Sequence, residues 1–523
     1  MDFDIVIAGG GFAGAYCARR LGAHFGPEAG PRRVALIAER NVLVFQPMLA
    51  EVAGSTLGPA DVVNPLRQFC RNVTVLQGSV QKIDWGRREL IVDGGRFTRN
   101  QMMGFRQLVL ALGNVANLSM LPGMMEYGWP LKYVPDALRL RAALIDRLEE
   151  ANLADDPKVR APLLTFVVVG GGFTGVEAAG QLLGLVRQAR KFYPALASTR
   201  IRFVLAHGGP ELLPEIGRSL GGYARRALER RGVEVRLNTL VSAITASQVH
   251  LSDGNRIDAH TVVTTVGSSP NPVAVELTRE LGLAHQKGRI QVEPTLQVAG
   301  EKGLWAIGDC AAVPWVDRGS IKTCPPTAQF AVRQGRKLAD NLFRISKGGA
   351  ARPFRYRYMG QLAAIGEREA VAEVMGFHFR GFFAWWLWRT IYLAKLPGVG
   401  RRLRVVIDWT FDLFFPRDIG ILLPPPDEVL RPAHLEKGEL LFAKGSPCRT
   451  IFYVRSGAVS FGEPGADGRR FPAGGIIGHE QADPDGFWLA NASATEPTDL
   501  IVFRSRAFQL LRRELKLVAR PRP

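Results

Sequence analysis

Cysteine is scarce in this chain, and the spacing of the few cysteines excludes most of their usual chemistry. The 523 residues include five cysteines, which are Cys17, Cys70, Cys310, Cys324 and Cys448. No two of them form a CxxC or CxxxxC pair, so the sequence favours neither a disulfide framework nor a metal site. We therefore expect no bound metal and interpret the thiols as buried side chains in a reducing compartment.

Long uncharged apolar runs and acidic residues are also in short supply. No such run reaches the roughly 20 residues of a membrane-spanning helix, and the N-terminus enters a predicted strand without a signal-peptide pattern. Acidic residues number 48 against 67 basic residues, for a net charge of +19, which indicates an anionic partner. Because zinc-finger and RNA-binding signatures are missing, we expect no nucleic acid and favour the cytoplasmic face of a membrane.

One pattern occurs twice in the chain. Phe3 to Leu21 reads FDIVIAGGGFAGAYCARRL, and Phe166 to Leu182 reads FVVVGGGFTGVEAAGQL. Each has an apolar β-branched run, a GxGxxG turn and a helical pattern, which is the context that a dinucleotide fingerprint requires. The sequence therefore predicts an α/β fold with two Rossmann-like dinucleotide-binding domains.

Each glycine of the first fingerprint has its own steric role. Gly9 permits the tight turn, Gly11 lets the backbone approach a pyrophosphate, and Gly14 lets the helix pack on its strand. The N-terminus of that helix offers free N–H groups and the positive end of a dipole. The next predicted strand, Arg33 to Ala38, ends at Glu39, which is placed to accept the hydroxyls of an adenosine ribose.

The second fingerprint differs from the first at the ribose position. Its glycines are Gly170, Gly172 and Gly175, and the next strand, Ile201 to Ala206, ends at His207 rather than at an acid. An acid there would favour NADH and repel the 2′-phosphate of NADPH. The choice between NADH and NADPH therefore stays open.

The order of the other predicted elements indicates an insertion. Short buried strands are predicted at Gln107 to Gly113, Val262 to Gly267 and Leu304 to Asp309, with an amphipathic helix at Asp136 to Asn152. We expect the second dinucleotide domain to interrupt the first. The expected domains are residues 1–130 with 296–360, residues 131–295, an amphipathic region at 361–421, and an all-β domain at 433–523 after a proline-rich linker.

Residues Phe377 to Phe415 mix aromatic and basic side chains. They include Trp385, Trp386, Trp388, Trp409, Arg380, Arg389, Lys395, Arg401, Arg402 and Arg404. This pattern favours helices that lie in a membrane interface, with rings at headgroup depth and cations toward lipid phosphates. An aromatic packing surface or a homodimer interface is the alternative.

Taken together, the motifs resemble those of the type II NADH:quinone oxidoreductases, a family of flavoproteins with two dinucleotide-binding domains. They are VIAGGGFAG, FQPMLAEVAG from Phe45, LTFVVVGGGFTGVE from Leu164, WAIGDCA from Trp305 and PPTAQFAVRQG from Pro325. The resemblance spans residues 3 to 420. It implies FAD in the first domain, NADH or NADPH in the second, and electron transfer to a membrane quinone without proton pumping.

The resemblance also implies roles for individual residues. Asp309 would lie on the flavin ribityl chain, and Ala328 and Gln329 beside the isoalloxazine ring and the quinone. Glu177 would lie near the nicotinamide, where a carboxyl group could order the cofactor or pass protons to a quinone. We assign Glu177 and Gln329 as catalytic. The other expected cofactor-binding residues are Phe12, Ala13, Gly113 and Gly267.

Departures from the family pattern leave alternatives open. Arg333 and Gln334 stand where many members have two glutamines, so the identity of the quinone stays open. Cys310 and Cys324 do not match the cysteines of sulfide:quinone reductases, although Cys324 precedes a predicted flavin-side helix. A soluble reductase of a ferredoxin or rubredoxin, and a redox-sensing regulator that signals through the last domain, are the alternative functions.

The last domain resembles a cyclic-nucleotide-binding β-roll. The resemblance rests on Leu435 to Phe461 and on PAGGIIGHE, from Pro472 to Glu480. That family binds the cyclic phosphate with a Gly-Glu pair and an arginine ahead of small residues. Here His479 follows Gly478, and the small-residue run Ala490 to Ala494 has no arginine. Without a guanidinium group, the bidentate contact to the phosphate is lost.

We therefore expect no tight binding of cAMP or cGMP. Isothermal titration calorimetry of the purified protein should show no saturable heat with either nucleotide at physiological concentrations. Micromolar affinity for either one would contradict this prediction.

Overall fold

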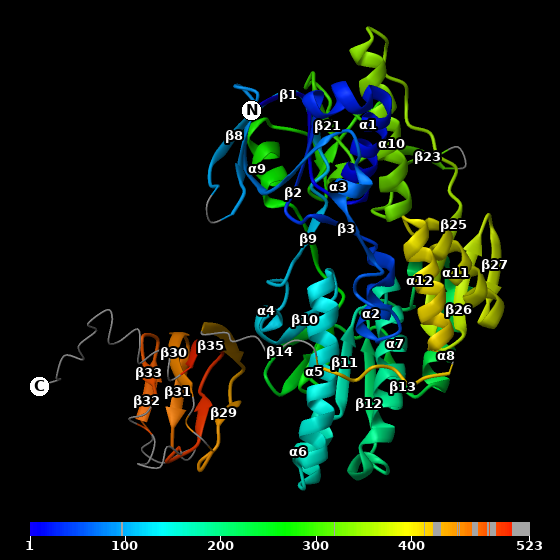
Figure 1. Ribbon diagram of the computed structural model, residues 1–523. Helices are drawn as coiled ribbons and strands as arrows, with labels where there is room; N and C mark the ends of the chain where they lie inside the picture. The colour runs from blue at the N-terminus through cyan, green and yellow to red at the C-terminus, as the bar shows by residue number, and fades with distance from the viewer. Residues whose placement is uncertain are drawn as a thin grey trace, which may run out of the picture.

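The computed structural model describes residues 1–95, 98–317, 320–412, 414–421, 430–446, 448, 450–462, 469–478, 481 and 488–504. It contains two α/β units, a small sheet covered by two helices, and an all-β unit toward the C-terminus (Figure 1). Figure 1 shows one α/β unit above the other, with the β unit in orange and red beside the lower one.

The first α/β unit is built on a sheet whose central strands are parallel. In chain order the strands are β1 (Asp2–Ala8), β2 (Val34–Ala38), β5 (Thr74–Gln77), β6 (Ser79–Asp84), β7 (Glu89–Asp93), β8 (Gln101–Leu110) and β21 (Leu304–Ala306). Across the sheet the order is β5-β2-β1-β8, and β8 then pairs with β21 along its C-terminal half and with antiparallel β7 along its N-terminal half. Because β21 comes from much later in the chain, this sheet combines two separate segments of the chain.

Helices α1 (Phe12–Arg33) and α10 (Ala328–Ser346) pack against each other beside this sheet. Their close approach depends on Gly335, because a Cβ there would clash with the Ala13 carbonyl oxygen. α1 bends at Gly26, where φ is +78° and Pro27 follows. The shorter elements of the unit are β3 (Val42–Val44), α2 (Leu49–Ala53), β4 (Val63–Pro65), α3 (Leu66–Phe69), β19 (His285–Gln286), β20 (Arg289–Gln291), β22 (Ala311–Ala312), β23 (Pro314–Asp317) and β24 (Ser320–Thr323).

The second α/β unit has a parallel sheet in the order β10-β17-β11-β12-β13. The strands are β10 (Gly128–Pro130), β11 (Thr165–Val169), β12 (Arg202–Ala206), β13 (Val233–Arg236) and β17 (Thr261–Thr264). The helices are α4 (Met124–Tyr127), α5 (Val134–Leu153), α6 (Pro157–Leu163), α7 (Phe173–Ala189) and α8 (Arg218–Arg230), and β14 (Val241–Ile244), β15 (Gln248–Leu251) and β16 (Arg256–Asp258) form an antiparallel meander. Every residue of β11 is buried, which explains its continuous apolar sequence.

Two connecting strands correct the expected domain boundaries. β9 (Asn114–Ala116) leaves the first unit and pairs with β18 (Ser268–Pro270), which leads back. After β18, α9 (Pro272–Glu280) buries Ala274 and Leu277 in the core of the first unit. The expected boundary between residues 295 and 296 is therefore wrong, because the apolar face of α9 needs the first unit to cover it. The second unit also begins earlier than residue 131, since β10 belongs to its sheet.

The region after α10 forms a small antiparallel sheet covered by two helices. Its strands are β25 (Gly360–Gly366), β26 (Glu369–Val374) and β27 (Phe377–Arg380), and its helices are α11 (Gly381–Lys395) and α12 (Val399–Phe411). The expected interfacial segment therefore begins as a strand and becomes helical only at Gly381. Among the described residues, no helix has the length and apolar character needed to cross a membrane.

The tryptophans of α11 and α12 divide between core and surface. Trp388 is 1% exposed and Trp409 is 5% exposed, whereas Trp386 is 51% exposed. The expectation that these rings all lie at headgroup depth is wrong for Trp388 and Trp409, because they pack against each other between the two helices. The large apolar side chains that remain exposed here are Phe377, Phe382, Phe383, Trp386, Val399, Leu403, Val406, Ile407, Phe411, Phe414 and Phe415.

The last unit consists of two antiparallel four-stranded sheets. Its strands are β28 (Leu430–Leu435), β29 (Leu440–Phe442), β30 (Thr450–Ser456), β31 (Ala458–Phe461), β32 (Arg469–Pro472), β33 (Ile476–Ile477), β34 (Ala492–Ala494) and β35 (Thr498–Arg504). This is the all-β unit that the sequence predicts. His479 lies outside the described residues.

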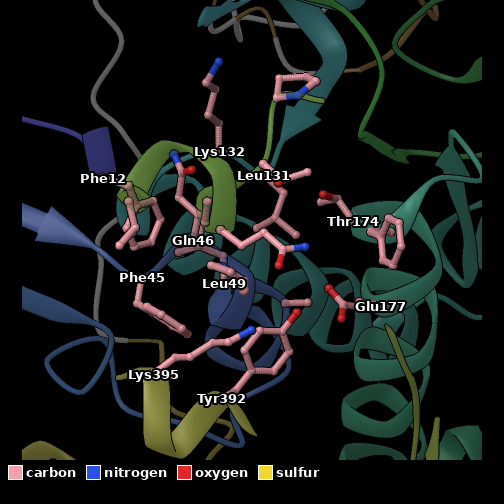
Figure 2. Close-up of a pocket in the computed structure, with 18 of the residues that line it drawn as sticks. Phe12, Phe45, Gln46, Leu49, Leu131, Lys132, Thr174, Glu177, Tyr392 and Lys395 are labelled. Carbon is pink, nitrogen blue, oxygen red and sulfur yellow. The ribbon is translucent and has the colours of Figure 1, made fainter. Parts of the chain in front are cut away.

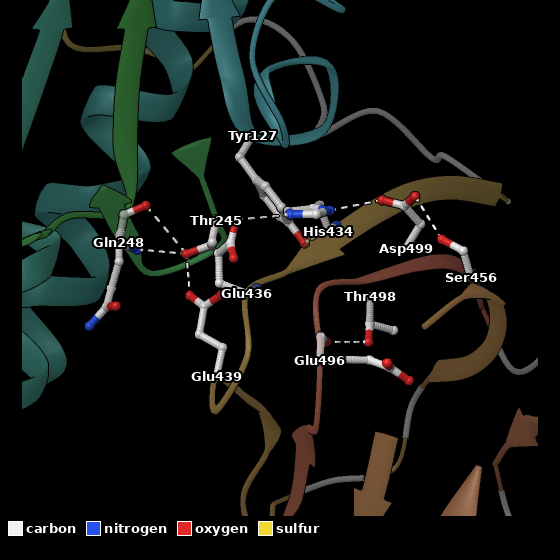
Figure 3. Close-up of polar contacts among 10 residues, drawn as sticks. All are labelled: Tyr127, Thr245, Gln248, His434, Glu436, Glu439, Ser456, Glu496, Thr498 and Asp499. Carbon is white, nitrogen blue, oxygen red and sulfur yellow. Dashed lines mark hydrogen bonds and ion pairs between the residues drawn. The ribbon is translucent and has the colours of Figure 1, made fainter. Parts of the chain in front are cut away.

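Polar contacts attach the β unit to the second α/β unit (Figure 3). The Thr245 hydroxyl donates a hydrogen bond to the Glu439 carboxylate, and the backbone N–H of His434 donates to the Tyr127 hydroxyl at 3.2 Å. The His434 ring in turn pairs with Asp499 at 2.8 Å. The backbone of β28 and the Glu439 side chain in the turn after it therefore hold the β unit against α4 and the meander.

Candidate active site

The first glycine turn leaves room for a phosphate only at its middle glycine. Gly9 has a φ of +117°, and a Cβ there would clash with the Ala111 carbonyl oxygen. A Cβ on Gly14 would clash with the Gly9 carbonyl oxygen. In contrast, a Cβ on Gly11 would meet no atom within 4 Å. This open space at the N-terminus of α1 suits the pyrophosphate of a dinucleotide.

The second glycine turn repeats this arrangement. Gly170 has a φ of +114°, Gly175 packs against the Gly170 carbonyl oxygen, and a Cβ on Gly172 would meet no atom within 4 Å. His207 follows β12, and its Nδ1 accepts a hydrogen bond from the Gly171 N–H at 3.2 Å. The imidazole is therefore attached to the fingerprint turn, beside the position where a ribose would lie.

Two arginines of the neighbouring strands β12 and β13 are already paired. Arg202 and Arg236 contact the Glu234 carboxylate at 2.8 Å and 2.6 Å. Burial raises the pKa of Glu234, but the two guanidinium groups outweigh burial and lower it. A 2′-phosphate that approached these arginines would have to compete with this carboxylate.

The GD motif lies against the first glycine turn. A Cβ on Gly308 would lie 3.0 Å from the Ala13 methyl group, so the motif and the start of α1 are in contact. Asp309 follows directly, with the cations of Arg289 and Lys132 acting on its carboxylate. Burial raises the pKa of Asp309, while both cations act in the opposite direction. A carboxylate at this place can accept hydrogen bonds from ligand hydroxyls.

Glu39 and Gly113 lie beyond the ends of β2 and β8, the two strands that flank β1 in the first sheet. Glu39 is exposed after β2 and accepts a hydrogen bond from the Ser79 hydroxyl at 3.2 Å. Gly113 follows β8 with a φ of +64°, and a Cβ there would meet no atom within 4 Å. Both positions are therefore accessible to a ligand that runs along the ends of these strands.

A pocket of about 960 Å³ lies where the two α/β units meet α11 (Figure 2). Figure 2 shows Thr174 and Glu177 of α7 on one side, Phe12 of α1 on the opposite side, and Tyr392 and Lys395 of α11 below them. The expected residues that line the pocket are Phe12, Glu177, Gly267, Ala328 and Gln329. The other expected cofactor-binding residues do not line this pocket and lie near the ends of the strands in the two sheets. Both nucleotide halves and α11 therefore open onto one cavity.

The N-terminus of α10 is part of the pocket wall. The Gln329 side chain donates to the Gly360 carbonyl oxygen at 3.0 Å and accepts from the Tyr356 hydroxyl at 2.8 Å. The amide is therefore held in one orientation. The Thr327 hydroxyl beside it is buried and has no hydrogen-bond partner in the part of the chain that the structure describes. Because α10 begins at Ala328, its dipole favours negative charge on a ligand here.

Glu177 places a buried carboxyl group in the same wall. The residue is 7% exposed, and its Oε1 accepts a hydrogen bond from the Ala364 N–H at 3.2 Å. Burial outweighs this hydrogen bond and raises the pKa of Glu177 to about 8. The carboxyl group is therefore largely protonated at neutral pH and can donate a proton into the pocket.

The structure adds pocket cations that no sequence motif marks. The lining includes Arg19, Lys132, Arg333, Arg336, Lys395 and Arg402. Burial lowers the pKa of Lys395, and the charge of Arg333 lowers it further. Arg333 is recognisable from the sequence only as a departure from the family pattern. Its neighbour Gln334 is 1% exposed and binds the Gly308 N–H at 2.8 Å, so it has a structural role.

The two cysteines nearest the flavin side are poor candidates for redox chemistry. Burial raises the pKa of Cys310 to about 11 and that of Cys324 to about 12. A thiol with so high a pKa forms little thiolate at neutral pH. Burial of both thiols therefore argues against a sulfide:quinone reaction at these residues.

Comparisons with known protein families cover most of the chain. Residues 3–335 match the pyridine nucleotide-disulphide oxidoreductase family, and residues 358–418 match the NDH2 C-terminal domain. Residues 432–514 match the cyclic nucleotide-binding domain.

Individual relatives agree with these matches. The chain is 30% identical over 425 residues to the type II NADH:quinone oxidoreductase Ndh of Mycobacterium tuberculosis. This alignment covers 78% of the chain and 87% of the relative. It is 30% identical over 414 residues to the demethylphylloquinone reductase NdbB of Synechocystis sp., covering 77% of this chain and 95% of that protein. The structure of NDH2 from Plasmodium falciparum with NADH has a TM-score of 0.73 at 19% identity, over 80% of this chain and 99% of that chain.

Fold and site thus define a flavoprotein oxidoreductase with two dinucleotide-binding domains. The chain belongs to the pyridine nucleotide-disulphide oxidoreductase family and, within it, to the type II NADH:quinone oxidoreductases. It is an FAD-dependent NAD(P)H dehydrogenase that passes electrons to quinone. The stretch from Asn41 to Gly54 contains no cysteine, so the dithiol of the disulphide reductases is missing from it.

The open space at Gly11 generates a direct test of the flavin site. Gly11→Val should fold but purify without yellow colour, because a Cβ at this position meets no protein atom within 4 Å and the branched side chain occupies the space for the pyrophosphate. Gly172→Val is the matched control, which should keep its flavin absorbance but lose binding of the nicotinamide cofactor. A yellow Gly11→Val protein with a full complement of FAD would show that the pyrophosphate lies elsewhere.

Proposed function

We propose that the pocket brings the nicotinamide, the flavin ring and the quinone headgroup together. The observation that supports this is the lining, which combines the start of α7, the start of α10 and the end of α11. The turn from Gly9 to Gly14, with Asp309, would hold FAD, and the turn from Gly170 to Gly175 would hold the nicotinamide cofactor. When bound, the flavin accepts hydride from the nicotinamide and returns two electrons to the quinone.

The protein itself positions the reactants and moves one proton. Gln329 is fixed by its contacts with Gly360 and Tyr356, so it presents a rigid edge to the flavin and the quinone. The N-terminus of α10 stabilises negative charge that develops on the ring system. Glu177, protonated at neutral pH, donates to the quinone oxygen. Phe12 and Tyr392 exclude water from the same space.

We infer that this enzyme discriminates against NADPH less strongly than an enzyme with a carboxylate at the ribose position would. His207 carries no negative charge to repel a 2′-phosphate, and Arg202 and Arg236 are occupied by Glu234 rather than free to attract it.

His207→Glu should shift the ratio of kcat/KM values toward NADH by about tenfold, which corresponds to about 1.4 kcal/mol of repulsion. His207→Gln is neutral and should leave the ratio close to that of the parent enzyme. Strong NADH selectivity in the parent enzyme, unchanged in His207→Glu, would show that His207 is not the ribose residue.

The exposed apolar side chains of α11 and α12 support peripheral attachment to a membrane. Phe382, Phe383 and Trp386 are each more than half exposed on α11, and Leu403 and Phe411 are similarly exposed on α12. Cations near an anionic leaflet add on the order of 1 kcal/mol each. We place this face on the cytoplasmic side of the plasma or inner membrane, where a lipophilic quinone could reach the pocket without crossing water.

Replacing Phe382, Phe383 and Trp386 together by Ser should move the enzyme from membranes into the soluble fraction. Turnover with a long-chain quinone should fall far more than turnover with ferricyanide, because ferricyanide reaches the flavin from water. The matched control is Leu153→Ser on α5, which is 82% exposed on another surface. Unchanged membrane binding together with a change in oligomeric state would identify this face as a homodimer interface, and equal losses with both acceptors would favour a soluble protein partner.

A further inference from the structure

Glu51 is a buried acid behind the pocket that the proposed chemistry does not use. It lies on α2, which packs against α7, and it is 4% exposed. Its neighbours Leu49 and Ala50 line the pocket, but Glu51 does not. A carboxyl group is seldom this buried without a partner or a function, because desolvation of its charged form is costly.

The charge of Glu51 acts on Glu177 across the packed helices α2 and α7. The Trp409 indole N–H of α12 donates to Glu51 Oε2 at 3.3 Å. The ring centroids of Trp409 and Trp388 of α11 lie 6.2 Å apart. The buried Trp388 indole N–H has no hydrogen-bond partner among the described residues. Glu51 is thus bonded to one ring of this aromatic pair and lies close enough to Glu177 for its charge to be felt there.

Arg417 fixes the spacing between the two helices that carry these acids. Its Nη1 donates to the carbonyl oxygens of Gly54 and Gln181, at 3.1 Å and 3.0 Å. The Arg417 side chain is only 4% exposed, and its Nε contacts Asp412 at 3.4 Å. Asp412 is 18% exposed, so this end of the cluster reaches solvent next to α12.

The charges that act on Glu51 come from every element packed around it. Arg389 of α11 and Arg417 favour its ionised form, while Asp412 disfavours it. On the α5 side, Arg141 donates to the Ser55 hydroxyl at 3.4 Å and is influenced by Asp418. Burial outweighs the cations and raises the pKa of Glu51 to about 7.

Quinone reduction needs a proton that the nicotinamide does not carry. NADH, one quinone and one proton give NAD⁺ and one quinol. Hydride supplies two electrons and one proton, so the second proton must come from solvent. After Glu177 has given its proton to the quinone oxygen, a buried carboxylate remains that has to be protonated again before the next turnover.

We propose that Glu51 supplies this proton to Glu177, so that the two acids form a relay from the Asp412 side of α12 to the pocket. In each cycle the Glu51 O–H bond breaks as the Glu177 O–H bond forms, and Glu51 then takes a proton from solvent. The relay rests on the proposed role of Glu177 as proton donor. Glu51 acts through Glu177 and is therefore a positioning residue.

The two acids are matched for such an exchange. Their pKa values, about 7 for Glu51 and about 8 for Glu177, are close, so a proton passes between them with little change in free energy. The charge of Glu51 is one cause of the raised pKa of Glu177.

Glu51→Gln tests the relay with two acceptors. Turnover with a soluble short-chain quinone should fall at least about tenfold above neutral pH, since general acid–base groups contribute at least this much. Turnover with ferricyanide, which takes up no proton, should change little. The alkaline limb of the quinone pH profile should move to lower pH, because Glu177 loses the nearby charge that raises its pKa. Glu51→Asp should restore part of the quinone rate.

Three further variants separate the outcomes. Thr56→Val removes a hydroxyl that donates to the Glu51 carbonyl oxygen and should leave both rates unchanged. Trp409→Phe removes an indole N–H that favours ionised Glu51, so Glu51 keeps its proton to higher pH and the quinone rate above neutral pH should not fall. If Glu177→Gln is impaired with quinone but Glu51→Gln keeps the parent rate and pH profile, the relay is wrong and the role of Glu177 stands. If Glu177→Gln reduces quinone normally, the proposed function of Glu177 itself fails. Equal losses with both acceptors in Glu51→Gln would also overturn the relay.

Discussion

The arrangement of the whole enzyme depends on how closely its backbone segments approach one another at glycine. Gly14 brings α1 onto the end of β1, and Gly335 brings α10 onto α1, so that the GD motif and the start of α10 meet the same turn. Gly175 does the same for α7. The N-termini of α1, α7 and α10 therefore open onto one space. Within the two fingerprints, the middle glycines Gly11 and Gly172 leave room for ligand phosphates.

Burial then decides the chemistry of that space. Several cations line the pocket together with Glu177, whose carboxyl group is kept protonated. A second acid, Glu51, lies behind the pocket among tryptophan and arginine side chains. In water these groups would be fully charged at neutral pH. In the folded protein, loss of solvation moves the pKa values of Glu51 and Glu177 into the range where a proton can be exchanged. Packing of α11 and α12 onto the second unit creates this environment.

The C-terminal parts of the chain therefore have distinct tasks. One side of α11 and α12 completes the wall around the acids, and the other side leaves a continuous set of large apolar side chains exposed. No described residue of the β unit lines the pocket. It instead docks on α4 and the meander through Thr245, Glu439 and His434, which connects it to the unit that would bind the nicotinamide.

The sequence by itself determined the features that depend on short-range pattern. The two glycine turns, the GD motif, the start of α10 and the all-β character of the last unit follow from local sterics and hydrophobic periodicity. Tertiary structure alone decided which unit α9 belongs to, which faces of α11 are buried, and which distant acids and cations become neighbours. A helical repeat shows which residues share a face, but it does not show what covers that face. Trp388 and Trp386 are two residues apart and differ completely in exposure for this reason. Glu51 and Glu177 acquire raised pKa values because tertiary packing buries both carboxyl groups.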